Sequence, residues 1–124
     1  MIAIGTDIVE VERVEAVFAR QGQRFLARIL TAREQAVAGR LTHPARFLAK
    51  RFAAKEAISK ALGTGIGRQL SWHDLDIESR SSGAPLVALS SRGRRVLESV
   101  GGSRVLITIS DERAYAVAFA VVLA

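Results

Sequence analysis

Two charged side chains stand one helical turn apart, immediately before a glycine-rich loop. Glu56 and Lys60 belong to RFAAKEAISKALGTGIG, residues 51–67, which predicts an amphipathic helix ending at its first glycine. A Glu four residues before a Lys is most often a surface ion pair. The glycines of loop 63–67, however, let a backbone approach a ligand and offer N–H groups to an anion. The loop could be a helix C-cap with a flexible exit, which explains Gly63 but not Gly65 and Gly67. It could also belong to a phosphate site, although it lacks the Gly-Lys-Ser/Thr order of a Walker loop.

Asp7, in GTDIVEVER, is the second isolated acid that could do chemistry. It follows an apolar stretch at the point where helical spacing begins, so its ordinary role would be to cap the next helix. Its other role would be to bind a hard cation, because Mg²⁺ typically takes one or two carboxylates together with substrate phosphates. Asp7 and Glu56 would supply that pair if the strand end packs beside the long helix. Both roles are open at this point.

Other reactive residue types lack the neighbours that catalysis would need. His43 and His73 have no partners at metal-ligand spacing and are expected on the surface. Ser59, Thr64 and Ser110 have no nucleophile elbow around them. Hydrolase chemistry is therefore not supported.

Strand and helix patterns alternate along the first half of the chain. Residues 1–9 predict a strand with a bulge or bend at Gly5. Helical spacing follows from residue 10, and it places three basic residues on one face: Arg13, Arg20 and Arg24. A short helical turn, a helix opened by the capping box Thr31–Glu34, and the long helix 44–62 complete this half.

The second half predicts mainly antiparallel strands. Alternation indicates strands around 75–78 and 85–89 joined by a turn at 81–83, then a helix capped by Ser90 or Ser91. Residues 105–109 and 115–123 predict the clearest hairpin. We therefore expect residues 1–124 to form a single α+β domain, with an antiparallel sheet, one long helix and several short ones.

Composition excludes several classes of protein. The chain has 124 residues, 49% of them hydrophobic, and no cysteine, so disulfides and thiolate metal sites are excluded. The longest apolar run, residues 114–124, is too short to cross a bilayer as a helix. The N-terminus lacks the pattern of a signal peptide, so the cytoplasm is the expected location.

Positive charge is concentrated between residues 20 and 55. This segment has nine Lys or Arg residues against one acid, Glu34, in a chain of net charge +6. Such a block attracts an anionic partner, which could be an acidic protein, a nucleic acid or a phosphorylated small molecule. A solvated basic face without a partner is the simpler interpretation.

Two segments together resemble a known family. IGTDIVEVERVE (residues 4–15) and FLAKRFAAKEAISKALGTGIG (residues 47–67) are similar to the holo-acyl-carrier-protein synthases of the 4′-phosphopantetheinyl transferase superfamily. RFLARILTARE (24–34), LSWHDLDI (70–77) and ITISDERAYAVA (107–118) extend the resemblance over nearly the whole chain. It implies the 4′-phosphopantetheinyl transferase fold and a role in fatty acid biosynthesis.

The resemblance also implies a reaction and a set of site residues. Such enzymes move 4′-phosphopantetheine from coenzyme A to a serine of apo acyl carrier protein and release adenosine 3′,5′-bisphosphate. By this resemblance Asp7 and Glu56 would bind Mg²⁺ on the pyrophosphate, and Lys60 would contact the same phosphates. The coenzyme A site would be lined by Arg51, Gly63, Thr64 and Gly65, and a basic helix would dock the acidic carrier protein through Arg13, Arg20 and Arg24. Short members of the family are typically homotrimers with coenzyme A sites shared between subunits, and the resemblance implies neither a nucleic acid nor a membrane as partner.

Three points stay open in the sequence. The proton acceptor for the carrier serine could be Glu56 or a metal-bound water. Many relatives have a histidine where ISDER has Asp111, so a phosphate contact is not transferred to Asp111, which is expected to turn the hairpin. One alternative function is a small basic nucleic-acid-binding protein, but the chain has few aromatic residues for base stacking and contains no recognised module. The other alternative is a structural subunit without activity.

Overall fold

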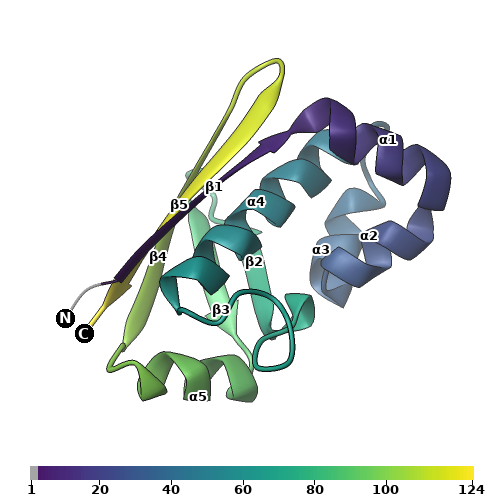
Figure 1. The fold of residues 1–124 in the computed structure, drawn as a ribbon. Helices are drawn as coiled ribbons and strands as arrows, with labels where there is room; N and C mark the ends of the chain where they lie inside the picture. The colour runs from purple at the N-terminus through teal and green to yellow at the C-terminus, as the bar shows by residue number, and fades with distance from the viewer. Residues whose placement is uncertain (1–2) are drawn as a thin grey trace.

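The computed structural model describes residues 3–124, so Met1 and Ile2 of the predicted N-terminal strand lie outside the described residues. The elements follow the predicted order of strand, helices and antiparallel strands (Figure 1). In chain order they are β1 (Ala3–Glu10), α1 (Val11–Gln21), α2 (Gln23–Ile29), α3 (Ala32–Ala38), α4 (Ala45–Ala61), the 3₁₀ turn η1 (Trp72–Asp74), β2 (Leu75–Ser79), β3 (Pro85–Leu89), α5 (Ser91–Ser99), β4 (Arg104–Asp111) and β5 (Tyr115–Leu123).

The strands form two antiparallel sheets where the sequence predicted one. The larger sheet has the order β1-β5-β4, and β2 pairs with β3 in a separate two-stranded sheet. Alternation along β5 buries Ala116, Ala118, Ala120 and Val122 on one face of the larger sheet, and α4 packs against this face. The predicted hairpin of the last two strands is confirmed, with Thr108 opposite Phe119.

Gly5 allows β1 to lie directly on α4. The bulge or bend predicted at Gly5 is wrong, because β1 pairs with β5 without interruption from Ala3 opposite Val122 to Glu10 opposite Tyr115. A Cβ atom on Gly5 would clash with the Ala57 carbonyl oxygen and lie 2.6 Å from the Ala61 backbone nitrogen. The glycine is therefore required for close approach of two backbones.

Helix α4 is the centre of the molecule, and it is buried on more sides than the amphipathic helix predicted from its sequence. It lies between the larger sheet and helices α1 to α3 (Figure 1). Its small side chains let neighbours approach on several sides, so that no solvent face remains over much of its length. Its buried residues are Leu48, Ala49, Arg51, Ala53, Ala54, Lys55, Ala57, Ile58, Ser59 and Ala61.

The basic first half is divided between two helices. Helix α1 ends at Gln21, and Gly22, with φ 58°, starts a new direction for α2. Arg13 and Arg20 lie on α1, whereas Arg24 lies on α2. The single shared face predicted for the three arginines is therefore wrong, since a left-handed residue interrupts the helical spacing.

Local signals elsewhere were reliable. The Thr31–Glu34 capping box is present in full, and the Ser90 hydroxyl accepts a hydrogen bond from the Gly93 amide at 3.0 Å. His43 and His73 are exposed, as expected. Within residues 3–124, none of the helices has the length and apolar character needed to span a bilayer.

Candidate active site

Asp7, Glu56 and Lys60 come together where β1 crosses α4. Asp7 lies inside β1, opposite Ala118, and its carboxylate Oδ1 accepts a hydrogen bond from Lys60 Nζ at 2.9 Å. Lys60 Nζ also donates to the Thr6 carbonyl oxygen at 3.1 Å. The N-cap residue of α1 is Glu10, so the capping role considered for Asp7 is wrong. The close crossing at Gly5 places Asp7 beside the helix that carries the other two residues.

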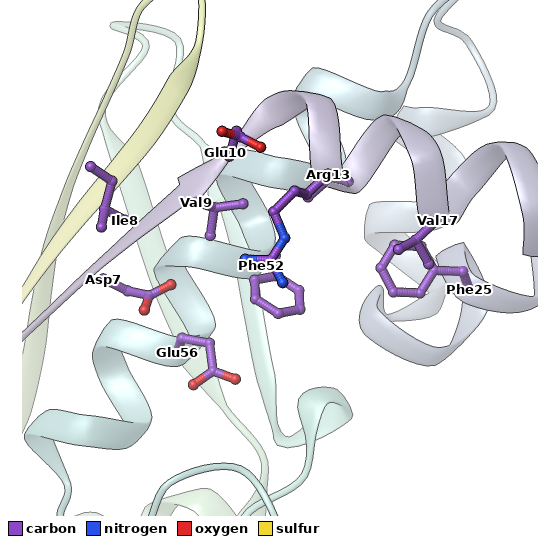
Figure 2. A pocket seen from close by; sticks show the side chains of 10 residues that line it. Asp7, Ile8, Val9, Glu10, Arg13, Val17, Phe25, Phe52 and Glu56 are labelled. Carbon is purple, nitrogen blue, oxygen red and sulfur yellow. The ribbon is translucent and has the colours of Figure 1, made fainter.

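Glu56 has an environment that disfavours its negative charge. Its pKa is raised, first by burial and then by the neighbouring charge of Asp7, while Lys60 opposes the shift. Figure 2 shows the Asp7 and Glu56 side chains on neighbouring elements, with both carboxylates directed into the same cleft. Two carboxylates that repel each other across a cleft, one of them already neutralised by an ammonium group, form a site suited to a cation.

The donor set fits Mg²⁺ bound together with phosphate. Among residues 3–124 no cluster of three or more His, Asp or Glu side chains could hold a metal alone. Mg²⁺ often takes one or two carboxylates and completes its octahedron with waters and substrate phosphate oxygens. Asp7 and Glu56 can supply that pair, and the ammonium of Lys60 is the positive charge that stands there in this structure.

A cleft of about 310 Å³ continues from these carboxylates along α1. Asp7 and Glu56 form its polar end, and its other walls are mainly apolar (Figure 2). Arg13 extends over this part from α1 toward Phe52. The apolar walls include Val9, Val14, Val17, Phe25 and Phe52. The cleft can therefore receive an elongated ligand or a partner side chain next to the carboxylate pair.

The glycine loop after α4 does not offer its first amides to an anion. The Gly63 N–H donates to the Lys60 carbonyl at 3.0 Å, and those of Thr64 and Gly65 donate to the Ser59 carbonyl at 3.2 and 3.1 Å. Gly63 and Gly65 have φ 81° and 64°, which the tight reversal requires. The predicted use of these amides as anion donors is wrong, because they cap the helix. Their place beside coenzyme A stays a prediction.

Arg51 lies away from this cleft. Its side chain is buried, with only 5% of the residue exposed, and its guanidinium stacks 4.6 Å from the centre of the Phe47 ring. It donates a long hydrogen bond of 3.4 Å to Ser79 Oγ, and Nε has no partner among residues 3–124. Burial lowers its pKa, while Glu34 and Asp76 oppose the shift. The structure does not bring Arg51 together with Asp7 and Glu56, so its coenzyme A contact stays a prediction.

Lys55 is a buried charged residue next to Glu56 in the chain, and sequence reasoning missed its burial. Its side chain is fully buried. The Nζ atom donates hydrogen bonds to Glu34 Oε1 at 2.6 Å, to the Ile29 carbonyl oxygen at 2.8 Å and to the Trp72 carbonyl oxygen at 3.1 Å. Burial lowers the pKa of Lys55, and Glu34 opposes that shift. These bonds connect α2, α3 and η1 to α4 one residue before Glu56. The available signal was a lysine among alanines in a helix that proved to be central.

Asp111 connects the hairpin to α4 and does more than form a turn. It is the last residue of β4 and accepts a hydrogen bond from Arg46 Nη1 at 3.2 Å. Arg46 also donates to the carbonyls of Glu112 and Arg113 at 2.6 and 3.0 Å. The tip of the hairpin is thereby fixed to the first turn of α4.

The three arginines expected to dock a carrier protein occupy different places. Arg13 lines the cleft, and Arg20 is exposed near the end of α1. Arg24 lines a separate hollow of about 480 Å³ together with Gln21 and Arg28. The structure therefore joins only Arg13 to the carboxylate site, and it adds Arg28 to the basic surface.

Comparison with known proteins gives relatives that are similar in both sequence and fold. The model of the 4′-phosphopantetheinyl transferase superfamily matches residues 3–120. A holo-[acyl-carrier-protein] synthase of Vibrio atlanticus is 48% identical over 118 residues, covering 95% of this chain and 94% of the relative. The crystal structure of the Neisseria meningitidis holo-[acyl-carrier-protein] synthase has a TM-score of 0.92 at 41% identity, covering 98% of both chains. The Bacillus anthracis synthase in complex with coenzyme A (3′,5′-ADP) has a TM-score of 0.81 at 37% identity, covering 97% and 94% of the two chains.

These similarities agree with the fold and the site. The chain belongs to the 4′-phosphopantetheinyl transferase superfamily, within its group of holo-[acyl-carrier-protein] synthases. The resemblance seen in the sequence and the α+β fold class are therefore confirmed. The interpretation as a nucleic-acid-binding protein is set aside in favour of a transferase.

Proposed function

We propose that this enzyme transfers 4′-phosphopantetheine from coenzyme A to a serine of apo acyl carrier protein, with a Mg²⁺ ion held by Asp7 and Glu56. The observation that carries the proposal is the pair of carboxylates in one cleft with Lys60 beside them. Membership of the holo-[acyl-carrier-protein] synthases supplies the substrates. The cytoplasm stays the expected location of the reaction.

The reaction is a displacement at phosphorus. The serine Oγ forms a bond to the phosphorus that carries pantetheine, the bond from this phosphorus to the bridging oxygen breaks, and adenosine 3′,5′-bisphosphate leaves. When bound, Mg²⁺ neutralises negative charge on the pyrophosphate oxygens. Asp7 and Glu56 would hold the metal ion, and Lys60, which lies one turn after Glu56 on α4 and contacts Asp7, offers an ammonium group to the same phosphates.

Glu56 is also suited to accept the serine proton. A raised pKa makes its carboxylate a better base than an ordinary glutamate, and burial is the first cause of that shift. A base must lie within hydrogen-bond reach of the serine, and the position of Glu56 in the cleft supports this role. A metal-bound water is the alternative proton acceptor, and the sequence also leaves this alternative open.

The carrier protein would approach over α1. Arg13 lines the cleft beside its apolar wall, so a partner with acidic and apolar side chains can dock next to the carboxylates. Arg20, Arg24 and Arg28 add positive charge along α1 and α2. The association is expected to weaken as the salt concentration rises.

The outer face of the larger sheet supports assembly into a homotrimer. The face turned away from α4 carries large apolar side chains that are exposed to solvent, and Ile4 and Ile8 each expose 63% of their surface. Leu106, Tyr115 and Phe119 continue this surface on β4 and β5. Contiguous apolar patches of this kind mark protein interfaces. A neighbouring subunit on this face would lie near β1 and hence near Asp7.

Mass spectrometry of an apo acyl carrier protein tests the proposed function. Incubation with the enzyme, coenzyme A and Mg²⁺ should add one phosphopantetheine to the carrier, and a chelator should prevent the addition. Glu56→Gln should lower the rate at least about a hundredfold while the variant stays folded. A chelator-resistant reaction would refute the metal, and no addition to fatty-acid or polyketide carriers would refute the proposed transfer to these carriers.

A further inference from the structure

Lys60 occupies a position that a metal ion on Asp7 would need. Its ammonium nitrogen lies 2.9 Å from Asp7 Oδ1 and 3.1 Å from the Thr6 carbonyl oxygen. The Asp7 side chain is only 16% exposed, so Lys60 satisfies a carboxylate that has little water around it. The Lys60 side chain is 50% exposed and therefore has room to move.

An ammonium group and Mg²⁺ compete for the same carboxylate oxygen, here Asp7 Oδ1. Both are cations, and a metal bond of about 2.1 Å would bring Mg²⁺ against the ammonium that now contacts the same oxygen. Their repulsion over such a distance outweighs what one exposed ion pair contributes. A metal that binds Asp7 Oδ1 must therefore displace the Lys60 ammonium from this oxygen.

We propose that Lys60 is a placeholder cation, which keeps Mg²⁺ off Asp7 until the pyrophosphate of coenzyme A draws its ammonium group away. This inference rests on the proposed function, since it takes Asp7 and Glu56 as the metal site. Lys60 exchanges one anionic partner for another, and the metal takes its place on Asp7. Metal and coenzyme A then favour each other's binding, and this coupling is reciprocal by thermodynamic necessity.

The coupling has a functional consequence. A metal bound without coenzyme A would block the pairing of Lys60 with Asp7 and leave the Lys60 ammonium without an anionic partner on this strand. Because Lys60 holds Asp7, the enzyme instead selects metal and coenzyme A together. The lysine is thus a positioning residue for the metal, beyond its place at the phosphates.

Binding of Mn²⁺, measured by electron paramagnetic resonance, tests the exchange without relying on activity. Lys60→Met removes the charge and keeps the length of the side chain. Lys50→Met is the matched control, because it makes the same substitution on the same helix. The Nζ atom of Lys50 lies 3.9 Å from Asp111 Oδ1 and so pairs with a different carboxylate. Without coenzyme A, Lys60→Met should bind Mn²⁺ about tenfold more tightly than the wild type. Lys50→Met should bind like the wild type.

Two further samples separate the possible failures. Asp7→Asn added to Lys60→Met should abolish the gain, which places the gained metal on Asp7. Wild-type enzyme with coenzyme A should bind Mn²⁺ more tightly than without it, and failure here would refute the metal site itself. If that coupling is present but Lys60→Met binds Mn²⁺ no better than Lys50→Met, the placeholder role is wrong while the proposed function stands.

Discussion

Replacing Gly5 with alanine tests how the active site is built. The new Cβ would lie 2.6 Å from the Ala61 nitrogen and clash with the Ala57 carbonyl oxygen. Both contacts are with the backbone of α4, which cannot rotate away as a side chain can. The strand and the helix must therefore separate, and β1 carries Asp7 two residues further along.

The size of the effect follows from this geometry. Overpacking a core costs about 1–3 kcal/mol, and a backbone contact belongs at the upper end, so we expect about 3 kcal/mol. For a domain of this size that corresponds to a fall in melting temperature of about 10–15 °C. A shift of about 1 Å between Asp7 and Glu56 should lower the transfer rate about a hundredfold in protein that is still folded.

Two other glycines provide controls for this variant. Gly67→Ala should be nearly neutral, because no atom lies within 4 Å of its new Cβ. Gly102→Ala should cost about 1 kcal/mol, since its new Cβ meets side-chain atoms of Leu97 and Val122 that can adjust. Thermal unfolding at one protein concentration and transfer assays at low temperature measure both effects. If Gly5→Ala is as stable and active as Gly67→Ala, the close crossing of β1 and α4 is not required.

Three further predictions concern other parts of the molecule. Lys55→Met should lower the free energy of unfolding by about 3–5 kcal/mol in urea, because it leaves the buried Glu34 carboxylate without its cation; a cost below about 1 kcal/mol would contradict this role. The raised pKa of Glu56 means that the folded state favours the protonated side chain, so the stability that this shift contributes is lost as the pH rises through the folded-state pKa. Glu56→Gln should therefore be at least as stable as the wild type at pH 7. The two should be equally stable below about pH 4, where Glu56 is protonated in both the folded and the unfolded protein. Marked destabilisation of Glu56→Gln at pH 7 would show a structural role. If the outer sheet face is the proposed subunit interface, Phe119→Asp should lower the mass found by light scattering from that of the wild type to that of a monomer, and an unchanged mass would contradict an interface on this face.

Much of the fold was accessible from the sequence because its signals are local. A capping box needs only Thr31 and Glu34, and strand alternation needs only neighbouring side chains, so both predictions hold. The position of Glu56 and Lys60 on one side of the same helix was visible as their spacing. The resemblance to a family assigned Asp7, which is distant in the sequence, to the same site as Glu56 and Lys60.

What the sequence did not predict depends on packing between distant segments. The bulge assigned to Gly5 is local reasoning applied to a residue whose constraint comes from α4. Lys55 resembles a surface lysine until η1, α2 and α3 close around it. The amides of the glycine loop could face an anion or the helix end, and only the folded backbone shows that they bond to Lys60 and Ser59.

The proposed mechanism requires Asp7 and Glu56 to hold one metal ion on the pyrophosphate of coenzyme A. A crystal structure of the enzyme with coenzyme A and Mn²⁺, with anomalous scattering to locate the metal, tests it most directly. We predict one anomalous peak about 2.1 Å from an oxygen of Asp7, of Glu56 and of the pyrophosphate, with Lys60 on the phosphates. A metal that contacts the pyrophosphate but neither carboxylate would contradict the claim.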